Sequence, residues 1–101
     1  MIRHSVYFRF IDGITTPARD QHVADFAALP ERIPEIKAYD FGTVIAGPDA
    51  KRGAEYDVAH YVDFVDPSTL GIYIDHPAHQ EFIARNKSSW SDVKVIDSRI
   101  E

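Results

Sequence analysis

The clearest pattern in the chain is an alternation of apolar and polar positions at its start. Between residues 2 and 10, every second residue falls on one face, which carries Ile2, His4, Val6, Phe8 and Phe10. The positions between them are mostly polar. A period of two is typical of a strand with one buried face. The sequence therefore predicts a strand over 2–10 that packs on a core.

Proline marks the predicted helix starts. Thr16-Pro17 combines an N-cap residue with proline at the first helical position, and apolar residues then recur at helical spacing until Pro30. Asp66-Pro67 has the same pattern of an N-cap residue followed by proline, and it predicts a short helix through residue 74. Pro77 interrupts that helix and starts another. The inner side of this last helix is expected to carry His79, Phe82, Ile83, Asn86 and Trp90.

Three further strands are predicted, over residues 36–44, 56–65 and 93–100. In the middle one, alternate positions are again apolar or His: Tyr56, Val58, His60, Val62 and Phe64. The polar segment 46–55, which contains Gly and Pro, is expected to be the most mobile loop.

The order of these elements predicts an α+β fold. Strand, helix, strand, strand, helix pair, strand is the ferredoxin-like β-α-β-β-α-β arrangement, with a four-stranded antiparallel sheet. Helices on one face leave the other face open, and we expect that face to carry Tyr7, Tyr61 and either Phe41 or Tyr39. Exposed aromatic rings favour a homodimer through the open sheet face; the alternative is a monomer with solvent-exposed rings.

Composition narrows the function classes. The 101 residues fit a single domain over 1–101. The absence of cysteine excludes disulfides and Cys-ligated metal. A net charge of −5 argues against a nucleic-acid partner. Neither a membrane span nor a signal peptide is recognisable, so we expect a cytoplasmic protein.

The histidines are the main candidates for chemistry. His4 and His60 lie on the buried faces of two strands expected to be neighbours, and His22 lies at the edge of the first helix's apolar stripe. His79 and Tyr73 are expected to face inward from the helix pair. Together they would converge on one space between sheet and helices, where each buried polar group needs a partner.

Each of these residues also has a purely structural interpretation. His4 and His60 could be hydrogen-bonded core residues, and His22 a surface residue. Tyr73 could be a core aromatic. His76 is most simply an N-cap or turn residue before Pro77.

Other catalytic motifs are missing. The sequence has no phosphate-binding glycine loop, no HExxH and no GxSxG. His76 and His79 have a spacing that suits a metal only if both are helical, and Pro77 argues against that. We therefore predict no metal and no cofactor.

Three segments resemble the stress-responsive dimeric α/β-barrel (Dabb) family. They are IRHSVYFRFIDG, LPERIPEIKAYDFG and, above all, YIDHPAHQEF. The resemblance covers nearly the whole chain. It implies a ferredoxin-like monomer whose dimer joins two sheets into a barrel. The family includes a cofactor-independent polyketide cyclase, which closes its product by aldol condensation.

The resemblance also implies site residues. Tyr73 and His79 match the catalytic Tyr and His of the cyclase. The implied substrate-binding residues are His4, Val6, Phe8, His22, Val23, Phe26, His60, Phe82 and Trp90. Because His22 and His60 stand where the cyclase has apolar pocket residues, we expect a more polar pocket and a different substrate.

The leading hypothesis is a small cofactor-independent enzyme acting on a carbonyl compound. His79 would be the general base, and Tyr73 would orient it or donate to the enolate oxygen. The first alternative is a non-catalytic dimer that binds a small carbonyl or aromatic ligand or serves a stress response. Two others are a divalent-metal site formed by His4, His60 and His79 and a cofactor-free monooxygenase, by analogy of fold.

Overall fold

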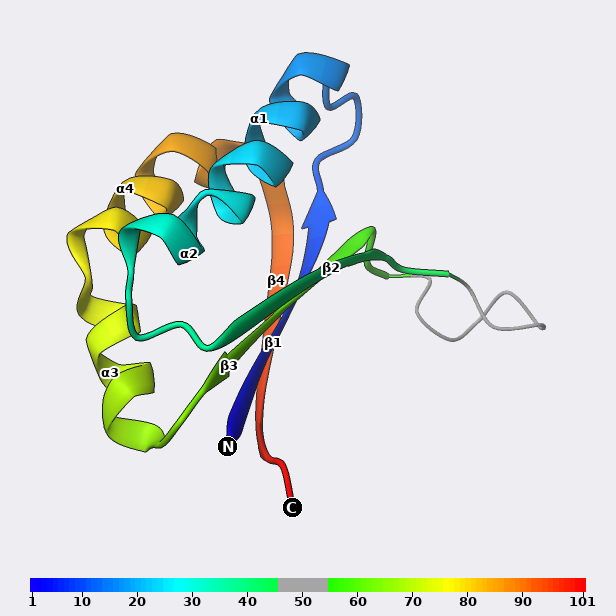
Figure 1. Ribbon diagram of the computed structural model, residues 1–101. Coiled ribbons are helices and arrows are strands. Elements are labelled where there is room, and N and C mark those ends of the chain that lie inside the picture. The colour runs from blue at the N-terminus through cyan, green and yellow to red at the C-terminus, as the bar shows by residue number, and fades with distance from the viewer. Residues whose placement is uncertain (46–54) are drawn as a thin grey trace.

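The computed structural model describes residues 1–45 and 55–101, and these form a sheet covered on one face by helices (Figure 1). The strands are β1 (Ile2–Phe10), β2 (Ala38–Thr43), β3 (Val58–Phe64) and β4 (Trp90–Arg99). They are antiparallel in the order β2-β3-β1-β4. The ferredoxin-like prediction is therefore confirmed.

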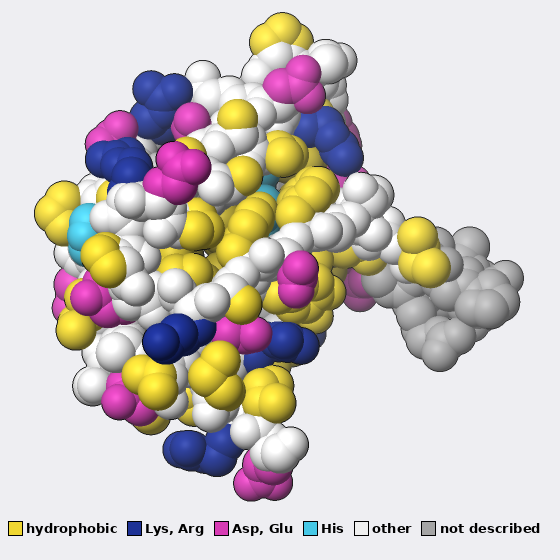
Figure 2. Space-filling model, in the orientation of Figure 1, with side chains coloured by type: hydrophobic (Ala, Val, Ile, Leu, Met, Phe, Trp, Pro, Cys, Tyr) yellow, Lys and Arg dark blue, Asp and Glu magenta, His cyan; other side chains and the backbone are white. Residues whose placement is uncertain are grey.

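The helices are α1 (Thr16–Ala27), α2 (Leu29–Arg32), α3 (Pro67–Asp75), α4 (Pro77–Asn86) and the short 3-10 turn η1 (Lys87–Ser89). Buried apolar side chains fill the layer between them and the sheet. Ion pairs tie the helices together on the outside: Arg32 of α2 binds Glu81 of α4, and Arg85 of α4 binds Asp25 of α1. Lys and Arg side chains accordingly mix with Asp and Glu over the helices in Figure 2.

Several boundaries differ from the predicted ones. The first helix ends at Ala27, and a separate short helix holds Pro30 in its first turn, where proline's missing N–H costs nothing. The last strand starts at Trp90, not at residue 93, so Trp90 reaches the core from the sheet and not from a helix. The expected mobile loop over 46–55 lies, except for Glu55, outside the described residues.

Two aromatic residues lie on the opposite face from the one expected. Tyr39 pairs with Val62, and Phe41 pairs with His60. Directly opposed residues of an antiparallel pair share a face, so Tyr39 and Phe41 face the helices. On an edge strand with a short apolar run, the sequence does not decide which set of alternate residues faces the core. Here it is the set that contains Tyr39 and Phe41.

The open face does carry the other two predicted rings. Tyr7 and Tyr61 meet edge to face, with ring centroids 6.3 Å apart. On the same face, the Arg3 guanidinium binds both carboxylate oxygens of Asp63, at 2.9 and 3.0 Å. Within the described parts of the chain, no helix has the length and apolarity to cross a bilayer.

The junction between α3 and α4 sets the direction of the residues that matter below. Asp66 caps α3 by accepting a hydrogen bond from the Thr69 backbone N–H. His76 ends α3 and caps α4, its Nδ1 accepting from the Ala78 N–H at 3.0 Å. The extended backbone of His76 turns the chain between the helices, so Tyr73 and His79 meet across the corner.

We predict that His76→Ala lowers the free energy of unfolding by about 1 kcal/mol, because it removes the N-cap of α4. His76→Asn should restore most of this loss, since asparagine is among the best N-cap residues. Urea unfolding followed by circular dichroism measures both. Equal stability of the Ala and Asn variants would contradict a capping role.

Candidate functional site

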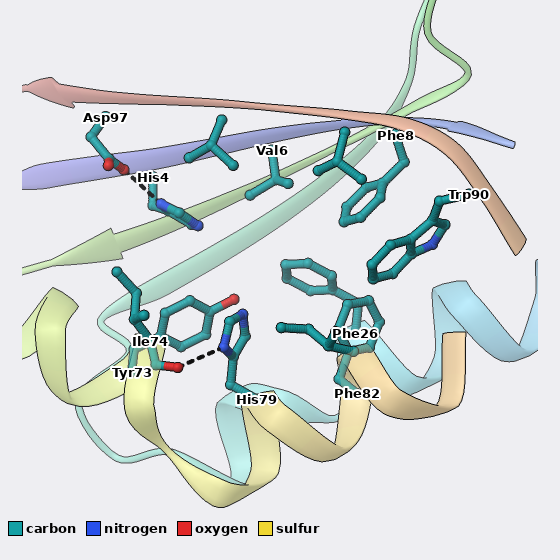
Figure 3. Close-up of a pocket in the computed structure, with 13 residues that line it drawn as sticks. His4, Val6, Phe8, Phe26, Tyr73, Ile74, His79, Phe82, Trp90 and Asp97 are labelled. Atoms are coloured by element: carbon teal, nitrogen blue, oxygen red, sulfur yellow. Dashed lines mark hydrogen bonds and ion pairs between the residues drawn. The ribbon is translucent and has the colours of Figure 1, made fainter. Parts of the chain in front are cut away.

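A cavity of about 300 Å³ lies between the helix-facing side of the sheet and helices α3 and α4 (Figure 3). Strands β1 and β4 form its roof, and α3 and α4 form its floor. Its lining comprises His4, Val6, Phe8, Phe26, Tyr73, Ile74, His79, Phe82, Ile83, Trp90, Val93, Val95 and Asp97. The polar groups gather at one end and the aromatic side chains at the other.

Tyr73 and His79 form the centre of the polar end. Their ring centroids lie 4.5 Å apart, and the hydroxyl and the imidazole both turn into the cavity. His79 Nδ1 lies 2.9 Å from the Ile74 carbonyl oxygen. A carbonyl only accepts, so Nδ1 carries the hydrogen and Nε2 of the neutral ring keeps its lone pair. The backbone thus fixes His79 in the form of a base.

The Tyr73 hydroxyl has no such partner. Tyr73 is fully buried, and within residues 1–45 and 55–101 its Oη is the one buried side-chain polar atom without a hydrogen bond. Burial raises the pKa of Tyr73 well above its ordinary value, so the hydroxyl keeps its proton and is a donor. A buried donor left unpaired is costly unless a bound molecule accepts from it.

His4 completes the polar end from the roof. Its Nδ1 lies 2.6 Å from Oδ1 of Asp97, which is its cross-strand partner on β4. This bond directs the opposite edge of the imidazole into the cavity, where it meets Tyr73 at 5.6 Å between centroids. Asp97 was not among the predicted site residues. The pairing of β1 with β4, which sets Asp97 opposite His4 on the same face, could have indicated it.

The environment of His79 favours its neutral form. Burial lowers its pKa below the ordinary value of 6.5, and the nearby His4 and His76 lower it further. The hydrogen bond to Ile74 opposes these effects without reversing them. A neutral imidazole with a free Nε2 can accept a proton near neutral pH.

The other end of the cavity is apolar. Phe8 and Trp90 lie 4.7 Å apart between ring centroids, and Phe82 contacts both rings. Phe26, Val6 and the exposed Val93 and Val95 extend the wall. Six of the predicted substrate-binding residues therefore line the cavity: His4, Val6, Phe8, Phe26, Phe82 and Trp90.

Three predicted substrate-binding residues do not line it: His22, Val23 and His60. His22 and His60 are fully buried and lie against the cavity-wall residues Phe8 and Phe26. The expected convergence of four histidines on one space is therefore wrong. Phe8 and Phe26 separate two groups of histidines, and the pocket is not made more polar by this pair.

His22 and His60 instead belong to a separate buried chain of hydrogen bonds. Trp90 Nε1 donates to His22 Nδ1 at 2.9 Å, and the two histidines join through their Nε2 atoms at 2.9 Å. His60 Nδ1 then contacts Tyr39 Oη at 2.8 Å. Burial lowers the pKa of His22 to about 4 and that of His60 to about 3, so both rings are neutral at pH 7.

The alternative hypothesis of a divalent-metal site requires His4, His60 and His79 to lie close together. His60 belongs to the other group, and the described residues contain no cluster of three His, Cys, Asp or Glu side chains that could hold an ion. His76 is engaged as a helix cap, as its structural interpretation predicted.

Comparison with known proteins gives consistent results. The chain is 26% identical over 96 residues to olivetolic acid cyclase from Cannabis sativa, covering 95% of this chain and 93% of the cyclase. It is 27% identical over 96 residues to the stress-response A/B barrel domain-containing protein HS1 from Arabidopsis thaliana, covering 95% and 86%.

A solved structure shows the same fold. A dimeric ferredoxin-like protein of unknown function from Thermobifida fusca matches with a TM-score of 0.81 and 28% identity, over 98% of this chain and 90% of that one. The family model described as "Stress responsive A/B Barrel Domain" (Dabb) matches residues 2–100. Because this match spans nearly the whole chain, the protein belongs to the Dabb family.

Proposed function

We propose that this Dabb protein is a small cofactor-independent enzyme that moves a proton at the carbon beside a carbonyl group. One observation carries the proposal: Tyr73 Oη, a buried donor with no partner among the residues that the structure describes, lies beside a histidine whose Nε2 is free to act as a base. A carbonyl oxygen accepts hydrogen bonds and its α-carbon loses a proton to a base, so both groups match one functional group.

The proposed reaction begins with His79 Nε2 taking a proton from the α-carbon. The electron pair of that C–H bond forms the C=C bond of an enolate, and the carbonyl oxygen gains the negative charge. The Tyr73 O–H donates a hydrogen bond to that oxygen. The enolate carbon then either recovers a proton from protonated His79 or attacks a second carbonyl of the same molecule, as in an aldol closure. In the second route the C=O π bond of that carbonyl opens to an alkoxide, which takes the proton from His79. The similarity to olivetolic acid cyclase supports the second route.

His4 would bind the substrate. Its Nδ1 is held by Asp97, so the opposite nitrogen is left for a second polar group of the ligand. The aromatic end of the cavity would hold an apolar or ring-shaped part. The volume lies at the lower end for ligand pockets, which favours a small carbonyl compound.

The second candidate is a non-catalytic binding protein with a stress-response role. The similarity to HS1 supports it, and the same unpartnered Tyr73 hydroxyl would bind a ligand without any reaction. The two candidates differ in one respect: only the enzyme exchanges the α-protons of a ketone with solvent.

The proposed assembly is a homodimer through the open sheet face. Tyr7 and Tyr61 present their rings there, and Arg3 and Asp63 beside them neutralise each other. The dimeric Thermobifida fusca protein supports this assembly.

We predict that Tyr73→Phe and His79→Gln each reduce α-proton exchange by about 10²-fold or more, the usual contribution of a positioned acid or base. The assay is deuterium uptake from D₂O into a panel of small methyl ketones, followed by NMR. Tyr73→Phe should leave thermal stability unchanged or raised, because it deletes a buried polar atom that has no partner.

The matched control is His76→Asn, which changes a histidine near the site but outside the cavity and keeps the helix cap. Above pH 7, where His79 is neutral with or without His76, it should retain the wild-type rate. Full exchange in Tyr73→Phe or His79→Gln would contradict the proposed roles. Ketone binding without exchange in the wild type would favour the binding protein.

The rate should also depend on pH in a defined direction. The base must be neutral, so kcat/KM falls as the pH drops through the pKa of His79. Burial lowers that pKa, so the acid limb should lie below pH 6.5. A pH–rate profile checks this, and an acid limb above pH 6.5 would contradict His79 as the buried base.

For the assembly, we expect light scattering to give twice the 11.4 kDa mass of the chain at micromolar concentration. Tyr61→Asp places an unpaired charge in the centre of the open face and should shift the mass towards one chain. A wild-type protein with the mass of one chain would refute the proposed homodimer.

A further inference from the structure

The buried pair His22 and His60 takes no part in the proposed proton transfer, yet it contacts the cavity wall. Trp90 lines the cavity with its ring and donates its indole N–H away from the cavity, to His22. Tyr39, at the other end of the hydrogen-bond chain, is half-buried and does not line the cavity. The hydrogen-bond chain thus runs from Trp90 at the cavity wall, across the core, to Tyr39 on β2.

The direction of every hydrogen bond in this chain is fixed by Trp90. An indole N–H only donates, so His22 Nδ1 must be the acceptor. The hydrogen of neutral His22 is then on Nε2 and is donated to His60 Nε2. His60 in turn carries its hydrogen on Nδ1 and donates it to Tyr39 Oη. No other placement of hydrogens on neutral rings satisfies all three contacts.

Packing holds the chain in this geometry. His60 stacks on Phe26 with ring centroids 3.8 Å apart and planes 4° apart. His22 packs edge to face on Phe8 at 4.6 Å and on Phe10 at 5.1 Å. Neither imidazole has room or solvent to exchange its partner, because both are fully buried.

We infer that His22 and His60 are positioning residues for Trp90: their hydrogen-bond chain locks the indole as a flat wall of the cavity and so selects substrates with a planar ring next to the carbonyl. The indole lies beside Phe8 and Phe82, at 4.7 and 5.6 Å, which gives that end of the cavity aromatic faces against which a ring can pack. The selection rests on the proposed function, because it takes the cavity as the substrate site. The locking of Trp90 does not.

Trp90 is the only tryptophan in the sequence, so its indole N–H can be followed without ambiguity. The measurement is solvent exchange of that N–H by NMR. His22→Phe keeps a buried flat ring but removes the acceptor. Tyr39→Phe removes the acceptor at the far end of the chain and does not touch Trp90.

Tyr39→Phe reaches Trp90 only through the hydrogen bonds. His60 Nδ1–H then has no acceptor, and a shift of its hydrogen to Nε2 would oppose the hydrogen on His22 Nε2. His22 could then only move its own hydrogen to Nδ1, against the indole N–H. Phe10→Leu is the control, because Phe10 packs on His22 but makes no hydrogen bond in the chain and does not line the cavity.

We expect indole exchange to accelerate by roughly tenfold in His22→Phe and Tyr39→Phe, the loss of about one hydrogen bond, and to stay within about twofold in Phe10→Leu. Unchanged exchange in both variants would overturn the inference. Equal acceleration in Phe10→Leu would also overturn it, because it would show that packing alone holds the indole.

Selection is tested with acetophenone and 2-octanone, ketones with the same number of non-hydrogen atoms, one planar and one flexible. The wild type should bind acetophenone more tightly, and both variants should lose most of that preference. A preference retained after the indole is loosened would overturn the role in selection. If the wild type binds neither ketone, the proposed function loses its support, and indole exchange still decides whether the chain holds Trp90.

The response of Trp90 fluorescence to acid is a second test of the hydrogen-bond chain. Protonation of His22 places a hydrogen on Nδ1, so Trp90 can no longer donate to it, and Trp90 fluorescence should change near pH 4, the pKa of His22. The charged groups nearest this ring are Arg19 and Asp25 of α1, and Asp25 is held by Arg85 and Asn86 of α4. Tyr39 of β2 stays protonated, because burial raises its pKa to about 12.

The lowered pKa of His22 also determines how the stability of the fold changes with pH. The unfolded chain takes up a proton near pH 6.5 and the folded chain only near pH 4, so the free energy of unfolding should fall as the pH drops from 6.5 towards 4. His22→Phe should reduce this fall and abolish the fluorescence change. A fluorescence change that persists near pH 4 in His22→Phe would contradict the assignment.

Discussion

The register of β1 between β3 and β4 is the constraint on which the polar end of the cavity and the buried hydrogen-bond chain both depend. Because side chains alternate along a strand, a slip of one residue would turn every inward group of β1 towards the open face. The observed register sets His4 beside Asp97 on one side and Val6 beside His60 on the other. Phe8 contacts His22, His60 and Trp90, so it stands between the cavity and the buried histidines.

The protein satisfies its buried polar groups in two contrasting ways. Trp90, His22, His60 and Tyr39 satisfy one another in series, so a group of polar rings is tolerated in the core. Tyr73 is as fully buried as His22 and His60, and its hydroxyl has no partner among the described residues. The first arrangement gives rigidity, whereas the second leaves an unmet hydrogen bond for a bound molecule. Only the second takes part in the proposed proton transfer.

The sequence predicted the architecture well, because the signals for it are local. Alternation in β1 and the Asp-Pro and His-Pro helix starts lie within a few residues, and they were enough to place His4, Tyr73 and His79 in one layer. The N-cap of the first helix is Thr15 and not the expected Thr16. What was missed depends on contacts between distant segments. Asp97 follows from strand register, and the separation of His22 and His60 from the cavity depends on the placement of Phe8 and Phe26. The face of Tyr39 depends on pairing with β3.

The hydrogen bond between His4 and Asp97 also has a consequence for the order in which the molecule folds. Its two residues are 93 positions apart, and Ile100 N–H donates to the Met1 carbonyl close by. Contacts of such separation must overcome a large loss of chain entropy and form late compared with helices. A chain in which β1 has paired with β3 but not with β4 would lack the roof strand, Trp90 and Asp97 together. Such an intermediate would have most of its secondary structure but not the cavity, so the cavity closes only in the final step of assembly.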